Sequence, residues 1–200
     1  MGKAEENKQQ KRNSLLQTAF ELFTTKGETK TSISDIADNA GVAKGTFYLY
    51  FRDKIDIKNK LIAHKTEKIF ETALEKLDAA ELESFSDKVI FIVDNILDQL
   101  TENPVLLRFI YKNLSWGVFR NVIESENKNG ESELYDVYNR IISENKYDIK
   151  EPEVMMYLII ELVSSSSYSS ILYNEPLPID KLKPHIFNTV RNIISQYQIR

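Results

Sequence analysis

The sequence predicts an all-α fold, and three observations support this prediction. Apolar residues recur at spacings of three and four along the chain, and no segment of useful length alternates apolar and polar residues as a strand does. Capping residues precede several of these apolar patterns, and glycine or proline follows them. The composition, 42% hydrophobic and 28% charged, is that of a globular protein with a buried core. We therefore expect helices joined by short polar loops.

The first part of the chain is expected to contain four helices. An apolar stripe predicts a first helix that ends at Gly27. Ser32 and Asp35 have the spacing of a capping box, so a second helix is expected to start there. Gly41 marks a break, and Lys54 lies at the start of a long helix. The expected ranges are 8–26, 33–40, 44–51 and 53–77.

The second part is expected to contain six helices. Ser84 and Asp87 repeat the capping pattern, and Pro152 lies in the first turn of a long helix. Asp180 is expected to cap the last helix, with Pro184 early enough in it to remove no internal hydrogen bond. The expected ranges are 85–100, 104–115, 118–126, 131–146 and 152–173, followed by a helix from 180 onward.

Composition and motifs argue against several classes of protein. Cysteine is absent, so neither a disulfide framework nor a thiolate metal site is expected. His64 and His185 stand in no metal or nucleophile motif, so we expect no catalytic residue, metal or cofactor. The polar first residues lack the apolar core of a signal peptide, and the longest apolar stretch, residues 154–163, is interrupted by Glu161. A soluble cytoplasmic protein with no membrane partner is expected.

Charge is unevenly distributed along the chain. Residues 1–60 hold eleven Lys/Arg and eight Asp/Glu, a net charge of +3, and the remaining residues hold fifteen and twenty-two, a net charge of −7. Together they give the overall charge of −4. A basic front on an acidic body suits a protein that presents one end to an anionic polymer. Ordinary surface charge is the alternative.

A helix-turn-helix arrangement is predicted around Gly41. Two short helices that cross closely need a small residue where they touch, which Ala37 provides. Gly41 can take the positive φ of the corner, and Ile36, Val42 and Phe47 can anchor the two helices in a core. The pattern indicates that the helix over residues 44–51 reads DNA. A plain pair of antiparallel helices with surface lysine and tyrosine is the alternative.

These residues carry a family resemblance. The run from Thr31 to Lys54, TSISDIADNAGVAKGTFYLYFRDK, resembles the signature of the tetracycline-repressor (TetR) family, and the upstream segment 19–23 and Gly27 have that family's spacing. The resemblance covers about residues 11–62 and is dense. Outside this range, the resemblance implies only the general layout of the family. The expected domains are a helix-turn-helix DNA-binding domain in residues 1–54 and a helical effector-binding and dimerisation domain in residues 55–200.

The resemblance implies how the first domain contacts DNA. The helix over residues 44–51 would enter the major groove and read base edges. Helix starts and lysines nearby would contact phosphate, and Lys8, Lys11 and Arg12 would form a basic arm. Ala43 departs from the family, which often has a capping Ser or Thr there. The expected DNA-contacting residues are Ser32, Ser34, Lys44, Gly45, Thr46, Tyr48, Leu49, Tyr50 and Lys54.

The resemblance also implies a homodimer on a palindromic operator, because one reading helix spans only a few base pairs. The last two helices would pair with their counterparts in a four-helix bundle. Alternatively, both belong to the core of a single chain. The serines of residues 164–170 suit close helix packing, with a polar ligand pocket as the alternative. The expected interface residues are Leu158, Leu162, Ser166, Ser169, Ile186, Val190, Ile193 and Tyr197.

The middle of the chain is rich in aromatic residues, which suit a pocket for a small hydrophobic or aromatic effector. The alternative is that they are ordinary core residues. Glu161, on a largely apolar helix, needs a partner, which is an internal arginine, a cationic ligand or water. The expected effector-contacting residues are Phe91, Arg108, Tyr111, Trp116, Phe119, Tyr157 and Glu161.

Taken together, these features predict a sequence-specific transcriptional regulator. The resemblance implies a repressor that an effector releases from its operator by tilting the helix over residues 54–77. Two alternatives keep the DNA-binding domain. In one, the chain is an activator, and in the other its C-terminal part binds a protein partner instead of a small molecule. Enzymatic activity is not expected.

Overall fold

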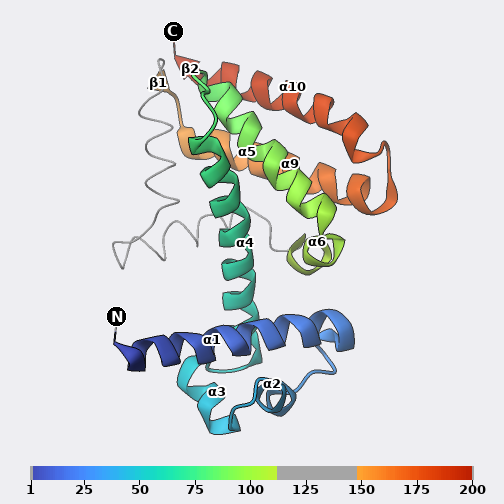
Figure 1. The fold of residues 1–200 in the computed structure, drawn as a ribbon. Coiled ribbons are helices and arrows are strands. Elements are labelled where there is room, and N and C mark those ends of the chain that lie inside the picture. Colours follow the sequence, from blue (N-terminus) through green and yellow to red (C-terminus); the bar gives the residue numbers. More distant parts are fainter. Residues whose placement is uncertain (1, 112–147, 200) are drawn as a thin grey trace. The chain divides into compact units, whose positions relative to one another are not determined.

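The computed structural model describes residues 2–111 and 148–199 of the chain. Within these ranges the fold is all α, as predicted, apart from one two-residue strand pairing. The chain divides into two compact units, Met1–His64 and Lys65–Arg200 (Figure 1). The helices predicted at 118–126 and 131–146, and the loop between them, lie outside the described residues.

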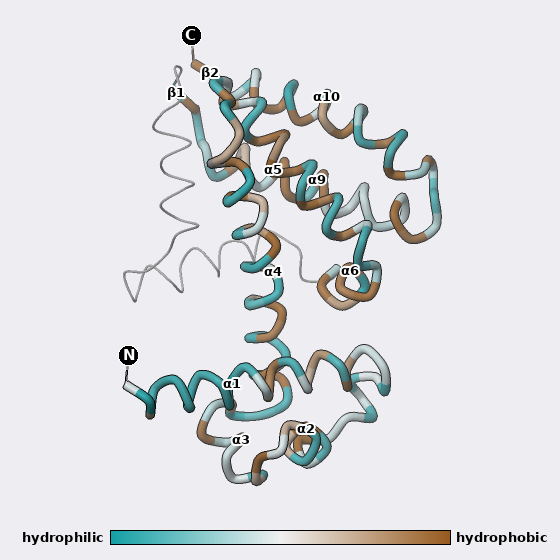
Figure 2. The backbone as a smooth tube through the Cα atoms, viewed as in Figure 1, coloured by the Kyte–Doolittle hydropathy of each residue, from teal (hydrophilic) through white to brown (hydrophobic). Residues whose placement is uncertain are grey.

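The first unit contains the predicted helices. Its elements are α1 (Lys3–Leu22), the π-helical turn η1 (Phe23–Gly27), α2 (Ile33–Asn39), α3 (Lys44–Tyr50) and the beginning of α4 (Lys54–Asp78). The helix α1 starts five residues earlier than predicted, and Lys8, Lys11 and Arg12, the expected basic arm, lie on it. This beginning of α1 is exposed and hydrophilic (Figure 2).

The core of the first unit is made by apolar side chains from all four helices. Phe47 of α3 is fully buried, and its ring centre lies 5.5 Å from that of Phe51. Ile57 and Leu61 of α4 are buried as well, so the beginning of α4 belongs to the first unit. The compact unit therefore extends to His64, ten residues beyond the expected boundary at residue 54.

The second unit contains the rest of α4 and four further helices in the described residues. These are α5 (Phe85–Glu102), α6 (Pro104–Ile110), α9 (Pro152–Tyr173) and α10 (Ile179–Tyr197). The strands β1 (Asp148–Ile149) and β2 (Gln198–Ile199) pair antiparallel, with Asp148 opposite Ile199. A two-residue strand is too short to show an alternating pattern, so the sequence did not predict this pairing.

Two predicted side-chain caps in the second unit do not form in the described residues, although α5 starts where the sequence predicts. Ser84 is the N-cap of α5, but among the described residues its side chain accepts no capping hydrogen bond. The N-cap of α10 is Pro178, so Asp180 lies inside the helix. Pro184 is then the sixth residue of α10, where it removes an internal hydrogen bond.

The longest helices of the second unit, α9 and α10, pack against each other, and α9 also packs against α5 and α6. Ser164, Ser167 and Ser170 lie three residues apart on α9 and are buried, and the Ser170 hydroxyl donates to the Leu177 carbonyl over 2.7 Å. Small side chains thus permit close packing within one chain. By length and composition, α9 is the one helix of the described residues that could cross a membrane, with 33% of that window buried.

Candidate nucleic-acid interface

The start of α2 is held by the predicted capping box. The Ser32 hydroxyl accepts a hydrogen bond from the Asp35 amide over 3.0 Å, and the Asp35 carboxylate accepts one from the Ser32 amide over 2.8 Å. The backbone N–H of Ser32 and the ammonium group of Lys26, 2.9 Å away, lower the pKa of Asp35 to about 2. Ser32 is exposed and Ser34 half-buried. A phosphate contact by either residue stays a prediction.

The turn between α2 and α3 has the predicted geometry. Gly41 has a φ of +69°, a conformation that a side chain disfavours. The Val42 amide donates to the Ala37 carbonyl over 3.0 Å, which closes the turn. Ala43 is the N-cap of α3 and has no side-chain oxygen to cap it. Its carbonyl still accepts the Thr46 amide over 2.8 Å, so α3 forms without the side-chain cap.

The helix α3 has one buried face and one open face. Phe47 points into the core, and its ring meets that of Tyr48 edge to face at 5.5 Å. Tyr48 and Leu49 are 52% and 80% exposed. Lys44 and Gly45 are also exposed, whereas Thr46 and Tyr50 are half-buried at the margins of the open face. The predicted reading residues of this helix therefore lie together on or beside one accessible face.

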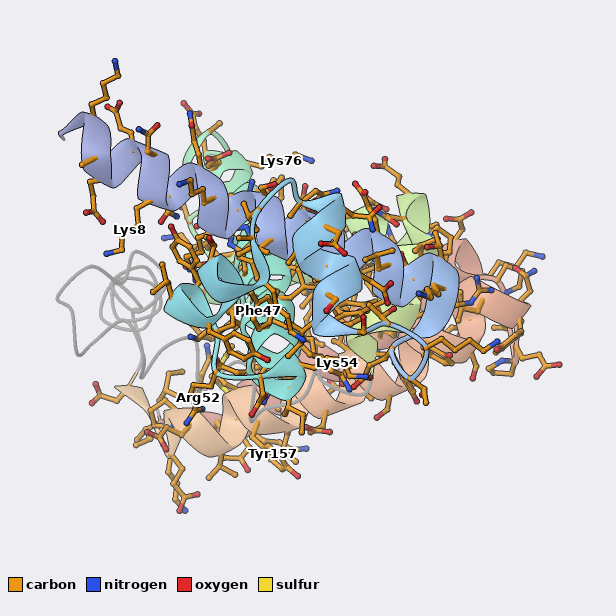
Figure 3. The ribbon with its side chains drawn as sticks, turned by 90° about the horizontal axis from the view of Figure 1, so that it is seen from below. Lys8, Phe47, Arg52, Lys54, Lys76 and Tyr157 are labelled. Atoms are coloured by element: carbon orange, nitrogen blue, oxygen red, sulfur yellow. The ribbon has the colours of Figure 1, made fainter. Side chains whose placement is uncertain are left out.

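Lys54 makes hydrogen bonds within the first unit. Its ammonium group donates to the carbonyls of Glu28 and Thr31, over 2.9 and 3.1 Å, and its side chain is half-buried. The ammonium group therefore ties the loop before α2 to the start of α4 (Figure 3). Lys58 adds an ion pair with Glu28 at 2.7 Å. These bonds use two of the three donors of the Lys54 ammonium group, and its phosphate contact stays a prediction.

A buried carboxylate, missed in the sequence, fixes the connection from α3 to α4. Asp56 is 8% exposed and accepts the Arg52 amide over 2.9 Å. Lys60 and the Arg52 side chain lie 3.3 and 3.5 Å from its oxygens. Burial raises the pKa of Asp56, but the Arg52 amide and the Lys60 ammonium group lower it by more, so the net shift is downward. The signal available in the sequence was Asp53, a residue type that caps helices. In the structure its carboxylate accepts the Asp56 amide over 2.8 Å.

The expected effector-contacting residues lie in different surroundings. Phe91 packs half-buried against the core, whereas Arg108 and Tyr157 are exposed, Tyr157 by 43%. Glu161 is half-buried on α9. Trp116 and Phe119 lie outside the described residues. The described members of the set thus range from half-buried to exposed, and the exposure of Tyr157 contradicts a position inside a closed pocket.

One aromatic contact joins α6 to α9. Tyr111 stacks on Tyr168 with the ring centres 3.5 Å apart, and Tyr168 meets Tyr173 edge to face at 6.3 Å. Burial raises the pKa of Tyr168, and Tyr173 raises it further. Sequence reasoning did not single out Tyr168, because it stands among the serines of α9.

The expected dimer-interface residues fall into two groups. Leu158 and Ser169 are exposed on α9, and Leu162, Ser166, Ile193 and Tyr197 are half-buried. Ile186 and Val190 are 3% and 0% exposed and belong to the core of the second unit. Those two side chains are enclosed by their own chain, so their assignment to an interface between chains is corrected.

Comparisons with known proteins agree with this geometry. Residues 15–58 match the bacterial regulatory proteins of the tetR family. The uncharacterized HTH-type transcriptional regulator YvdT of Bacillus subtilis is 44% identical over 63 residues, which are 32% of this chain and 30% of that protein. The HTH-type transcriptional repressor KstR2 of Mycobacterium tuberculosis is 25% identical over 181 residues, which are 83% of this chain and 82% of that protein.

Solved structures have a similar fold over most of the chain. The crystal structure of the transcriptional regulator FadR from Bacillus subtilis in complex with stearoyl-CoA has a TM-score of 0.63 at 18% identity, with 91% of this chain and 97% of that chain covered. At this identity the likeness concerns the fold alone. The match to YvdT spans about a third of that protein's length, so it does not concern that protein as a whole.

Proposed function

Because the N-terminal domain of this chain belongs to the tetR family of bacterial regulatory proteins, we propose that the chain is a homodimeric repressor of transcription. It binds a palindromic operator in the cytoplasm and leaves it when a small-molecule effector binds. The similarity to the repressor KstR2 over 83% of the chain supports repression. Activation of transcription through the same DNA-binding domain is the alternative.

The open face of α3 carries this proposal. It presents Lys44, Thr46 and Tyr48, whose ammonium and hydroxyl groups can bond to base edges or phosphates, on a helix narrow enough for the major groove. The buried Phe47, together with the hydrogen bond from the Arg52 amide to Asp56, holds this helix in a fixed orientation within the first unit. A rigid helix with polar groups on its open face is what base reading requires.

Selection of duplexes from a random pool tests DNA reading. The wild-type chain is expected to enrich a motif with two-fold symmetry, with half-sites centred about one helical turn or a multiple of it apart. Thr46→Ala and Tyr48→Ala should lose enrichment, whereas Thr101→Ala on α5, far away in sequence, should keep it. A folded chain that enriches no sequence at low salt would contradict the proposal.

The exposed apolar residues of α9 support the proposed dimer. Val154, Tyr157 and Leu158 are 44%, 43% and 39% exposed and follow one another on the same side of the helix. Pairing with a second copy would remove this surface from water. We expect Leu158→Lys to give a monomer in sedimentation experiments and to lose operator binding, while Val105→Lys on α6 leaves the dimer intact. A Leu158→Lys protein that stays dimeric would contradict this interface.

The proposed effector site lies in the apolar cluster of the second unit. Ile69 and Ala73 of α4, Leu100 of α5 and Leu107 of α6 are buried there together. Thr66 of α4 is 2% exposed, and its hydroxyl has no hydrogen-bond partner within the described ranges. A buried hydroxyl without a partner is costly, and a ligand oxygen would satisfy it. The stearoyl-CoA complex of FadR, a protein of similar fold, makes a long-chain acyl group the first candidate.

Thermal denaturation with stearoyl-CoA tests this site. We expect the melting temperature to rise with ligand concentration and operator binding to weaken, because the ligand must favour the state that does not bind DNA. Thr66→Val should reduce the rise in melting temperature that the ligand causes. Thr101→Val, which removes the hydroxyl group of an exposed residue on α5, should leave that rise unchanged. An unchanged melting temperature in the wild type would exclude this class of effector.

The helix α4 supplies the connection that release requires. Ile57 and Leu61 near its start are buried in the first unit, and Ile69 and Ala73 further along are buried in the second. A ligand that displaces the latter pair therefore acts on the same helix that supports α3. The coupling free energy depends on how differently the ligand binds the two states.

A further inference from the structure

The open face of α3 has an apolar centre. Gly45 and Leu49 each lie two residues from the buried Phe47, which places them about 160° around the helix from it. Leu49 is 80% exposed, the highest value among the exposed large apolar side chains of the described residues. At Gly45 a Cβ atom would meet nothing within 4 Å, so the backbone itself is accessible. The two positions form the most outward line of α3.

A leucine at this place has no evident role in folding. It is almost fully exposed, and alanine is the better helix former, so the side chain contributes little to the stability of α3. It can neither donate nor accept a hydrogen bond, so it cannot read the polar groups of base edges or bind a phosphate. The one apolar group that a base pair offers in the major groove is the C5 methyl of thymine.

We propose that Leu49 reads a thymine methyl group, so that each half-site of the operator carries a thymine opposite this residue. The proposal rests on the proposed function and specifies what α3 reads at its centre. Gly45, one turn earlier on the same line, lets the backbone of α3 approach the bases closely. Thr46 and Tyr48 lie on either side of this line and supply hydroxyl groups to neighbouring base edges.

The test uses the duplex that the wild-type chain enriches from the random pool. Each thymine of the half-site is replaced in turn by deoxyuridine, which lacks only the methyl group, and binding is measured by fluorescence anisotropy. At one position the wild type should lose about fourfold in affinity per half-site, the worth of one buried methyl group. Leu49→Ala should bind the thymine duplex more weakly and should lose nothing further on replacement by deoxyuridine. Val105→Ala on α6 serves as the control and should respond as the wild type does.

The outcomes separate this proposal from the proposed function. If the wild type enriches a motif but deoxyuridine has no effect at any position, Leu49 does not read a methyl group, and DNA reading by α3 stands. If deoxyuridine costs Leu49→Ala as much as it costs the wild type, another residue reads the methyl, and the assignment to Leu49 is wrong. If no sequence is enriched at all, the proposed function fails and this inference fails with it.

Discussion

Removing the Asp56 carboxylate should loosen the connection between α3 and α4. The side chain is 8% exposed and accepts the Arg52 amide over 2.9 Å, with Lys60 at 3.3 Å. A hydrogen bond to a charged group contributes about 1.5–3 kcal/mol, and Asp56→Ala also leaves the Arg52 amide without its acceptor. We therefore expect the local free energy of opening to fall by about 2 kcal/mol, which is roughly a thirtyfold faster amide exchange. Asp56→Asn keeps an acceptor oxygen and should lose less.

Hydrogen exchange followed by mass spectrometry resolves this effect, because it reports each segment separately. Peptides from residues 44–60 should exchange faster in Asp56→Ala, whereas peptides from α5 should not change. Asp38→Ala, which removes an exposed carboxylate on α2, is the matched control. If residues 44–60 of Asp56→Ala exchange within a factor of about two of the wild type, the reasoning from burial and hydrogen bonding is refuted.

The stability that the Asp56 carboxylate contributes should depend on pH. The folded pKa of Asp56 lies below its ordinary value, so the carboxylate stabilises the fold above the unfolded pKa of about 3.9, and the stabilisation is lost as the pH falls through the folded pKa. The difference between the wild type and Asp56→Ala should therefore stay constant from pH 7 to about 5 and shrink below about 4. A difference that grows on acidification would contradict this sign.

Three further predictions concern other contacts. Asp35 should titrate with a pKa of about 2 in carbon-detected NMR, and Lys26→Ala should raise that value, since the ammonium group helps to lower it. Ser167→Leu should destabilise the second unit by about 1–3 kcal/mol in urea unfolding, because the serine is 1% exposed and leucine overfills the space. Burial lowers the pKa of Lys183, but its bonds to Asp94 and Asp98 raise it by more. Lys183→Met should thus lower the melting temperature by about 2–4 °C at pH 7, and the difference should vanish as the pH rises above about 10.4 through the raised pKa.

The helix-turn-helix could be predicted because its signals are local. The capping box joins Ser32 to Asp35, three residues apart, and Gly41 sets the turn by its own conformation. The apolar residues of α2 and α3 lie within about a dozen positions of one another. Sequence patterns at this range determine structure directly, and the structure confirms both the helices and the turn.

The roles of charged residues could not be predicted in the same way. Lys54 bonds to carbonyls that lie 26 and 23 residues earlier, and only the folded chain brings them together. Asp56 resembles any polar residue at a helix start until the fold buries it. From the sequence, a lysine near a DNA-reading helix suggests a phosphate contact. In the folded chain, the ammonium group of Lys54 donates hydrogen bonds to backbone carbonyls.

Periodicity also leaves open what covers an apolar face. The apolar stripe of α10 predicts a buried face correctly, but it does not say whether the same chain or a second copy buries it. Ile186 and Val190 are buried by their own chain, while Leu158 of α9 stays exposed. The beginning of α1 shows that a helix can also form without an apolar stripe. Its residues are polar, so no apolar pattern in the sequence predicts the helix there.

One competition experiment tests directly the claim that α3 reads a DNA sequence. The wild-type chain is bound to its selected duplex at near-physiological salt and challenged with a duplex of the same composition in shuffled order. We expect a preference of about a thousandfold or more for the selected duplex. Thr46→Ala combined with Tyr48→Ala should remove most of this preference and leave the weaker, salt-dependent binding to both duplexes. Equal affinity of the wild-type chain for the two duplexes would contradict the claim.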